Sequence, residues 1–224
     1  MSISLAKFSA SCNDVASLLQ HCGSLGNRQF SVRYPAELPS IMRKLTYRDR
    51  WQSCIENGWY DFSLDDGSFF QMRFSEDHLS YSFMQCPFDY MSFEDFAYDK
   101  LGEEWVLFEP ELREEYEFYR SNETSEQSVT PIRYDYEPSL YREGFHPAGH
   151  VHFGIDNEIR IGTKKIFTPL TFTLFVVRQH YPLLWERVLA HEKIEIISRE
   201  IRDNLPAVHS NFFGVHDARE HYLV

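Results

Sequence analysis

Residues suited to acid–base and phosphate chemistry concentrate in one stretch of the sequence, from Pro131 to Pro182. The main candidates are Arg133, Asp135, Glu137, His146, His150, His152, Arg160 and Arg178. Histidine suits the roles of general acid and general base because its unperturbed pKa lies near neutrality. Arginine presents forked N–H donors that match a phosphate group. Together these residue types suit the cleavage of a phosphodiester bond, in RNA especially.

Three interpretations of these residues are open. In a metal-free enzyme, His150 and His152 supply the general base and general acid, and Asp135 or Glu137 orients an imidazole. The groups that would bind substrate are Arg133, Arg160, Arg178 and His146. In a metal-dependent variant, Asp135, His150 and His152 are ligands, since two histidines and a carboxylate form an accepted set. In the third, the groups only satisfy one another on a polar sheet face. We assign His150, His152 and Asp135 to catalysis, with no metal and no cofactor, and leave open whether the protein is an enzyme.

The spacing around the histidines predicts the strands that carry them. Apolar residues alternate with polar ones from His150 to Ile155 and again from Ile159 to Gly162, which is typical of strands with one buried face. The polar residues 156–158 predict a hairpin loop. We expect Ile155 opposite Ile159, which places Gly154 opposite Arg160 and His152 opposite Gly162. The histidines and Arg160 then share one face. Residues 133–137, RYDYE, alternate in the same way and predict a neighbouring strand.

The rest of the chain predicts an α+β fold with a single domain over residues 1–224. Period-two patterns indicate strands at residues 59–64, 69–74 and 79–88, so we expect an antiparallel sheet of about five or six strands. Helices from both ends should pack on its apolar face. The expected helices begin after Asn13 or Asp14, span residues 41–58, start at Thr168–Pro169, and run from Pro182 to about Leu205.

Residues 92–120 predict an acidic, largely helical insertion, interrupted near Gly102 and Pro110. Its acidic face suits either solubility or docking to a basic partner. Residues 61–140 carry 5 Lys+Arg and 20 Asp+Glu, and the whole chain has a net charge of −12. Bulk electrostatics therefore disfavour contact with nucleic acid, which must be local. The basic residues of the 41–58 helix offer one such surface.

No stretch of sequence reaches the roughly 18 apolar residues of a membrane span, so we expect a cytoplasmic protein that does not contact a membrane. The four cysteines, Cys12, Cys22, Cys54 and Cys86, lack metal-ligand spacing and indicate free thiols in a reducing compartment. The sequence ends with His209, His216 and His221, which we interpret as packing or surface residues, as we do His78 in its turn.

The segment from Arg133 to Pro182 resembles a bacterial domain-of-unknown-function family. The resemblance lies in YDY, HPAGHVHFG, RIGT and FTPLTFTLFVVRQHYP. Members of that family are encoded beside a helicase in anti-phage defence loci, so the resemblance implies a helicase partner. It supplies no reaction, cofactor or catalytic residue. We therefore expect a component of such a system, either an effector that cleaves nucleic acid presented by the helicase or a non-catalytic accessory protein that regulates it.

Overall fold

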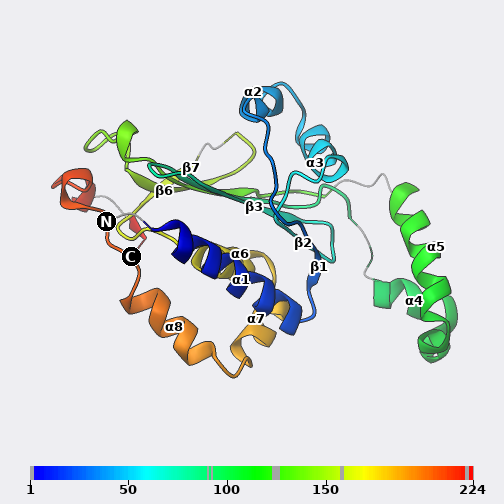
Figure 1. The fold of residues 1–224 in the computed structure, drawn as a ribbon. Coiled ribbons are helices and arrows are strands. Elements are labelled where there is room, and N and C mark those ends of the chain that lie inside the picture. The colour runs from blue at the N-terminus through cyan, green and yellow to red at the C-terminus, as the bar shows by residue number, and fades with distance from the viewer. Residues whose placement is uncertain are drawn as a thin grey trace. The chain divides into compact units, whose positions relative to one another are not determined.

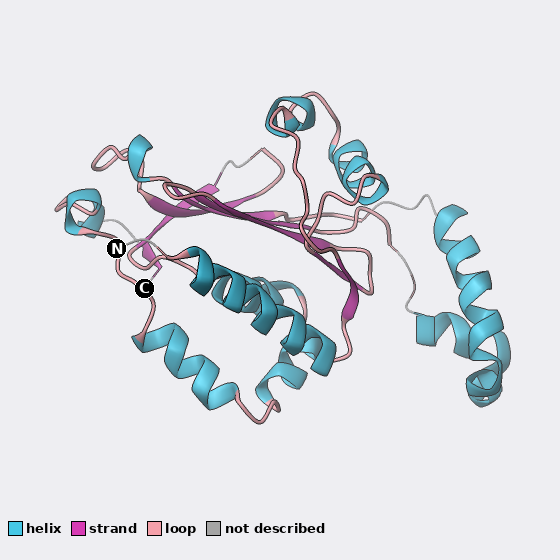
Figure 2. Ribbon diagram, in the orientation of Figure 1, coloured by secondary structure: helices cyan, strands magenta, loops and turns pink. Residues whose placement is uncertain are grey.

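The computed structural model describes residues 3–89, 91, 93–122, 127–156, 159–219 and 222–223. Its β-strands form a single sheet in the order of the sequence. Figures 1 and 2 show this sheet with helices on both of its faces. Neighbouring strands are antiparallel except for the last pair, which is parallel. The strands are β1 (Leu25–Arg28), β2 (Phe62–Leu64), β3 (Phe69–Phe74), β4 (Leu79–Met84), β5 (Ile132–Tyr136), β6 (Gly149–Phe153), β7 (Ile159–Thr163) and β8 (Tyr222–Leu223).

The α+β class and the antiparallel meander are confirmed, and the sheet has eight strands where we predicted five or six. The additional strands β1 and β8 lie at the two edges of the sheet. The sequence of β1, LGNR, has no alternation of apolar and polar residues, and its two central residues are exposed. Such edge strands form because a neighbouring strand offers hydrogen bonds, so they leave little trace in the sequence pattern.

One face of the sheet carries the main hydrophobic core. Helix α1 (Leu5–His21) and helix α6 (Pro169–His180) pack there, together with α7 (Pro182–Leu189) and α8 (Ile194–Asp203). Figure 1 shows these four helices on the same side of the sheet. Phe172 of α6 is fully buried against the aromatic rings of Phe70 and Tyr81 from β3 and β4. The predicted packing of both chain ends on the apolar face is confirmed for these helices.

Helices α2 (Leu38–Met42) and α3 (Tyr47–Glu56) lie on the opposite, polar face (Figure 1). The indole N–H of Trp51 donates to the carbonyl of Gly67, and the Gln71 amide of β3 reaches the Cys54 sulfur. Our prediction of one helix over residues 41–58, packed on the apolar face, was wrong. Thr46 interrupts that helix because its hydroxyl accepts from the Asp49 N–H and caps a new helix.

Other helix boundaries follow local capping. Thr168 caps α6, with Pro169 in its first turn, and Pro182 begins α7, both as predicted. Helix α1 begins earlier than we predicted, at Leu5, because the Ser4 hydroxyl accepts from the Lys7 N–H. The helix predicted to extend to about Leu205 is divided into α7 and α8. The remaining short helices are η2 (Pro138–Leu140), η3 (Ser210–Phe212) and η4 (Asp217–Arg219).

The hairpin of β6 and β7 has a different register from the one that we predicted. His152 lies opposite Arg160, and His150 lies opposite Gly162. The predicted pairs of Gly154 with Arg160 and His152 with Gly162 were wrong. Gly154 has φ +91°, and β6 ends just before it, at Phe153. Of the predicted hairpin loop, residues 157 and 158 lie outside the described residues. The change moves the pairing by an even number of residues, so the predicted faces are preserved.

The chain divides into two compact units, one of residues 1–85 and 130–224 and one of residues 86–129. The second unit contains α4 (Phe93–Leu101), η1 (Gly102–Phe108) and α5 (Glu109–Asn122). It includes the predicted acidic segment, and Gly102, at φ +59°, interrupts its helices as expected. Pro110 instead lies in the first turn of α5, where its missing N–H costs nothing.

Two further sequence predictions concern the whole chain. The four cysteines are free thiols, with Cys12 half-buried and Cys22, Cys54 and Cys86 buried. Among the described residues, none of the helices has the length and apolar character that crossing a bilayer requires. Of the terminal histidines, His209 and His216 are placed at the surface, and His221 lies outside the described residues.

Candidate functional site

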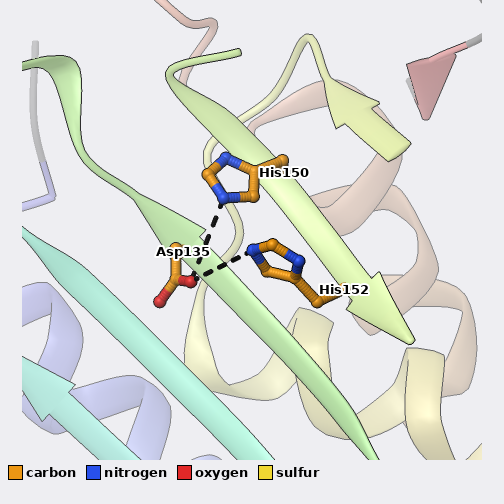
Figure 3. A group of neighbouring side chains, drawn as sticks. All are labelled: Asp135, His150 and His152. Atoms are coloured by element: carbon orange, nitrogen blue, oxygen red, sulfur yellow. Dashed lines mark ion pairs between the residues drawn. The ribbon is translucent and has the colours of Figure 1, made fainter. Parts of the chain in front are cut away.

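Asp135, His150 and His152 come together on the polar face of the two central strands β5 and β6 (Figure 3). Asp135 lies directly opposite His150, and His152 lies opposite Arg133. The Nε2 atoms of His150 and His152 are 4.0 Å and 3.6 Å from Asp135 Oδ2. Their ligand-type atoms all lie within 4.8 Å of one another. The predicted convergence of these three residues is therefore present.

Three neighbouring side chains hold the Asp135 carboxylate. Arg133 Nε donates to Oδ2 at 2.7 Å, Ser80 Oγ donates to Oδ1 at 2.8 Å, and His78 Nε2 is 3.8 Å from Oδ1. Burial alone would raise the pKa of Asp135. The interactions with His78, Arg133 and Ser80 outweigh burial and hold that pKa well below its usual range. Asp135 is thus a buried, ionised and oriented carboxylate at neutral pH.

The His150 ring is fixed in one orientation and one tautomer. Its Nδ1 lies 2.9 Å from the carbonyl oxygen of Pro147. A carbonyl only accepts, so Nδ1 carries the proton and the Nε2 lone pair of the neutral ring is directed toward Asp135. Burial lowers the pKa of His150 to about 4, although Asp135 and the Pro147 carbonyl act in the opposite direction. His150 is therefore neutral at pH 7.

The loop that carries Pro147 is anchored by the end of the chain. Asp217 accepts from the Tyr141 hydroxyl at 2.6 Å and from the Gly144 N–H at 3.0 Å. It also accepts from the Gly214 N–H at 2.8 Å, so one buried carboxylate joins the β5–β6 loop to the tail. This contact supports the position of the Pro147 carbonyl and, through it, the His150 ring.

His152 is the more weakly satisfied of the two histidines. It is 2% exposed, and its Nδ1 has no hydrogen-bond partner among the described residues. The 3.6 Å separation of its Nε2 from Asp135 is longer than a hydrogen bond. Burial, followed by the charge of Arg133 and the nearby His150, lowers its pKa to about 3. A buried imidazole without hydrogen bonds is costly, which is unusual unless the site has another use.

The structure brings most of the other predicted residues near this cluster. The His146 ring lies 5.0 Å from the His150 ring, centroid to centroid, and its Nδ1 is also buried without a hydrogen-bond partner in the described part of the chain. Arg160 faces the same side from β7, is exposed, and helps lower the pKa values of both buried histidines. Arg178 is not brought there. It lies on α6, across the sheet, with its guanidinium over the Trp185 ring.

A cavity of about 540 Å³ borders the cluster between the sheet and helices α2 and α3. Asp135 lines it, whereas His150 and His152, each 2% exposed, lie behind Asp135. The charged residues and the histidine that line it are Arg43, Arg50, Arg73, His78, Arg133, Asp135 and Glu137. Four arginines against two carboxylates make the cavity locally cationic in a chain whose net charge is −12. This volume is typical of a small-ligand site.

Sequence reasoning missed His78, Ser80 and Arg73 as parts of the site. We interpreted His78 as a surface residue of a turn, yet its Nε2 reaches Asp135, and that contact raises the pKa of His78. The signal was present in the alternation of His78, Ser80 and Ser82 with Leu79 and Tyr81. Extending the strand pattern back by one residue would have placed His78 on the polar face.

The chemistry open to the cluster is narrower than the sequence indicated. A general base works best with a pKa near the operating pH, and values of about 4 and 3 make His150 and His152 weak bases at neutrality. Neutral imidazoles with free lone pairs are instead suited to binding a cation. The cavity arginines are suited to binding an anion, and phosphate matches their forked donors.

One comparison with known proteins gives a match. A family model described as "Uncharacterized conserved protein (DUF2290)" matches residues 18–215, which include Asp135, His150, His152 and the residues that line the cavity. No curated protein and no solved structure matches the chain.

Proposed function

Since the chain belongs to the uncharacterized conserved family DUF2290, we propose a function from its site and from the resemblance of residues 133–182. The protein is a component of a helicase-associated bacterial defence system against phage. In that system its arginine-lined cavity binds the phosphate backbone of nucleic acid, which the protein cleaves. The helicase presents the strand.

The observation that carries this proposal is the orientation of Arg133. Its Nε is engaged by Asp135, and its side chain is 38% exposed at the cavity. No hydrogen bond from either Nη atom is found among the described residues, which leaves both free for an incoming oxygen. Arginines held in this way by a carboxylate present a preorganised fork to phosphate. Arg73 enters the same cavity from β3 and stacks over the Tyr34 ring at 4.4 Å.

The charge distribution supports a partner that supplies most of the affinity. The net charge of −12 repels a polyanion, and the cavity offers only a few cationic contacts. Nucleic-acid affinity scales with the number of phosphates neutralised, so the isolated protein should bind weakly and with a shallow salt dependence. A helicase that holds the nucleic-acid strand would compensate for this weak binding, because it raises the local concentration of the strand at the cavity.

The alternative function, a non-catalytic accessory protein, is favoured by the unit of residues 86–129. That unit has 13 Asp and Glu residues and 3 Lys and Arg residues. Val106, Leu107 and Phe118 are 61%, 77% and 73% exposed on it. Exposed apolar side chains among acidic ones are typical of a docking surface for a basic partner. In this alternative the helicase binds that unit and the cavity has no catalytic role.

A phage-plating assay with the intact gene pair separates these possibilities. The variants are a deletion of this gene, Arg133→Gln and Arg73→Gln together, and the control Arg113→Gln. Arg113 lies on α5 in an exposed pair with Glu109, so its substitution removes an arginine without touching the cavity. We expect protection to be lost in the deletion and in the cavity variant and kept in the control.

Unchanged protection after deletion would refute the defence role. Protection kept by the cavity variant, with normal folding by circular dichroism, would remove nucleic-acid cleavage and leave the accessory function. If the cavity variant loses protection, a control must show that the purified variant still binds the helicase. Its cleavage of RNA and DNA in the presence of the helicase should then be lower than that of the unsubstituted protein.

A further inference from the structure

The cluster of Asp135, His150 and His152 has the composition of a metal centre. We propose that these three residues bind one divalent transition-metal ion, with zinc as the expected occupant. The inference does not depend on the proposed function, because metal binding is measured without any substrate.

The distances fit an ion after a small contraction. A tetrahedral ion about 2.1 Å from each ligand separates its ligand atoms by roughly 3.4 Å. The observed separations from Asp135 Oδ2 are 3.6 Å to His152 Nε2 and 4.0 Å to His150 Nε2. In Figure 3 both imidazoles direct a nitrogen at the same carboxylate oxygen. The three ligand atoms all lie within 4.8 Å of one another, so side-chain rotation has to bring them closer together to reach bonding distance.

The surroundings of the three side chains are those of metal ligands. Ligating histidines commonly donate their second N–H to a backbone carbonyl, as His150 Nδ1 does to Pro147. Ligating carboxylates are themselves hydrogen-bonded, as Asp135 is by Ser80. These contacts orient the lone pairs before any ion arrives. Both histidines lie on β6 and Asp135 lies on the neighbouring strand β5, so a rigid sheet holds all three ligands, which reduces the ordering cost of binding.

His152 supplies an independent observation. It is 2% exposed, its Nδ1 has no partner in the described part of the chain, and its Nε2 is held 3.6 Å from Asp135. A ring placed only for packing would be replaced without loss by an apolar side chain. The separation of 3.6 Å is too long for a hydrogen bond, so the Nε2 atom that faces Asp135 is the one available to bind an ion, and Nδ1 is the nitrogen that keeps the proton.

The ligand set indicates which ion is expected. Two imidazoles and one carboxylate form the three protein ligands of many catalytic zinc sites, in which a fourth position stays open to water or substrate. Hard ions such as Mg²⁺ prefer an all-oxygen set and are disfavoured here. Asp135 is the ligand that reaches the cavity, so an exchangeable fourth ligand would arrive from that side.

The positive charge of Arg133, which contacts Asp135, could oppose the ion, as could that of the nearby Arg160. Arg133 Nε is 2.7 Å from Asp135 Oδ2, the oxygen that the histidines also face. A carboxylate oxygen has two lone pairs, so Arg133 can keep one while the ion takes the other. If charge repulsion prevails, the half-exposed Arg133 side chain has the cavity to move into.

The test measures zinc and cobalt binding to tag-free, full-length protein that has first been treated with a chelator. Titration with Zn²⁺ in a calorimeter gives stoichiometry and affinity, and Co²⁺ reports tetrahedral coordination through its visible absorption. The substituted proteins are Asp135→Asn, His152→Asn and Ser80→Ala, with His209→Asn as the control. His209 is an exposed histidine whose Nδ1 accepts from the Asn211 N–H, a contact that asparagine can imitate.

We expect one zinc ion per chain in the unsubstituted protein and in His209→Asn. Binding should be lost in Asp135→Asn and in His152→Asn. Ser80→Ala keeps all three ligands and should bind about 10–100-fold more weakly, the usual effect of removing a supporting hydrogen bond. Because this substitution is small, it keeps the test valid if His152→Asn fails to fold.

The absence of stoichiometric binding by the unsubstituted protein would overturn the proposal. So would binding that survives Asp135→Asn or is equally weakened by His209→Asn, since the ion would then lie elsewhere. Cobalt bound at these residues with octahedral rather than tetrahedral absorption would overturn the choice of zinc.

Discussion

The ion pair of Arg133 and Asp135 connects a residue that lines the cavity with the carboxylate that faces the buried histidines. The strength of this pair can be measured. We consider a double-mutant cycle of Arg133→Gln and Asp135→Asn in chelator-treated protein. Both replacements are polar and remove the charge; asparagine matches aspartate in size, and glutamine is shorter than arginine. Asparagine also keeps an oxygen that can accept from Ser80, so that hydrogen bond can survive the substitution.

The expected coupling lies between two limits. Exposed ion pairs contribute about 0.2–1 kcal/mol, whereas breaking a buried pair from one side costs about 3–5 kcal/mol. Here Nε and Oδ2 are 2.7 Å apart, and the side chains are 38% and 11% exposed. Solvent screens the arginine more than the carboxylate, so we expect a coupling energy of about 1–2 kcal/mol. Asp135→Asn should be the more destabilising single change, because it also removes the partner of His78.

The assay is urea unfolding followed by far-ultraviolet circular dichroism and by tryptophan fluorescence. The two transitions must coincide before free energies are compared, since the chain contains two compact units. For a chain of this size each 1 kcal/mol corresponds to roughly 2–4 °C in Tm, which gives an independent check. A coupling below about 0.3 kcal/mol, the usual error of additivity, would refute the assigned role of the pair. An Asp135→Asn variant more stable than the parent would show that the carboxylate is strained when no ion is bound.

Three further predictions address the framework of the site. Phe172→Ala should destabilise the protein by about 3–5 kcal/mol, because Phe172 is fully buried between α6 and the sheet; a loss below 1 kcal/mol in urea unfolding would contradict that packing. Tyr134→Phe should cost about 1–3 kcal/mol, because the buried Phe167 N–H donates to the Tyr134 hydroxyl at 3.1 Å and would lose its acceptor; a slower-exchanging Phe167 amide in the variant would be the opposite of the expected result. His180→Gln should flatten the loss of stability on acidification. Burial lowers the pKa of His180 in the folded protein. The contribution of His180 to stability is therefore complete above the pKa of the unfolded state, near 6.5, and declines as the pH falls below that value. Identical slopes of unfolding free energy between pH 7.5 and pH 5.5 in both proteins would disprove the assignment.

The sequence was sufficient for the strands that carry the site and for their faces. Alternation of apolar and polar residues is a local property of a strand, so it placed Asp135, His150, His152 and Arg160 on one side. Helix starts with a capping hydroxyl followed by proline, as at Thr168, could be predicted for the same reason. Such features depend on residues within one or two turns of each other.

Register and partners were decided only by the tertiary structure. Alternation determines which face a residue occupies, but registers that differ by two residues put the same side chains on that face. The register of β6 with β7 follows from the end of β6 just before Gly154. Whether a helix covers the polar or the apolar face depends on distant packing, so α2 and α3 could not be assigned from their own pattern. The cavity that they form with β3, β4 and β5 is lined by Arg73 and His78, and a strand pattern shows the face of such residues but not what covers that face.

The cluster of Asp135, His150 and His152 was thus determined by the sequence of residues 131–162, through a periodicity that sterics impose on every strand. Its chemical character was determined by burial. The same histidines would titrate near neutrality on an exposed sheet face. Placed behind Asp135 they lose hydration, and their pKa values fall to about 4 and 3. Desolvation depends on what the remaining chain packs around a group, and that is a property of the folded molecule alone.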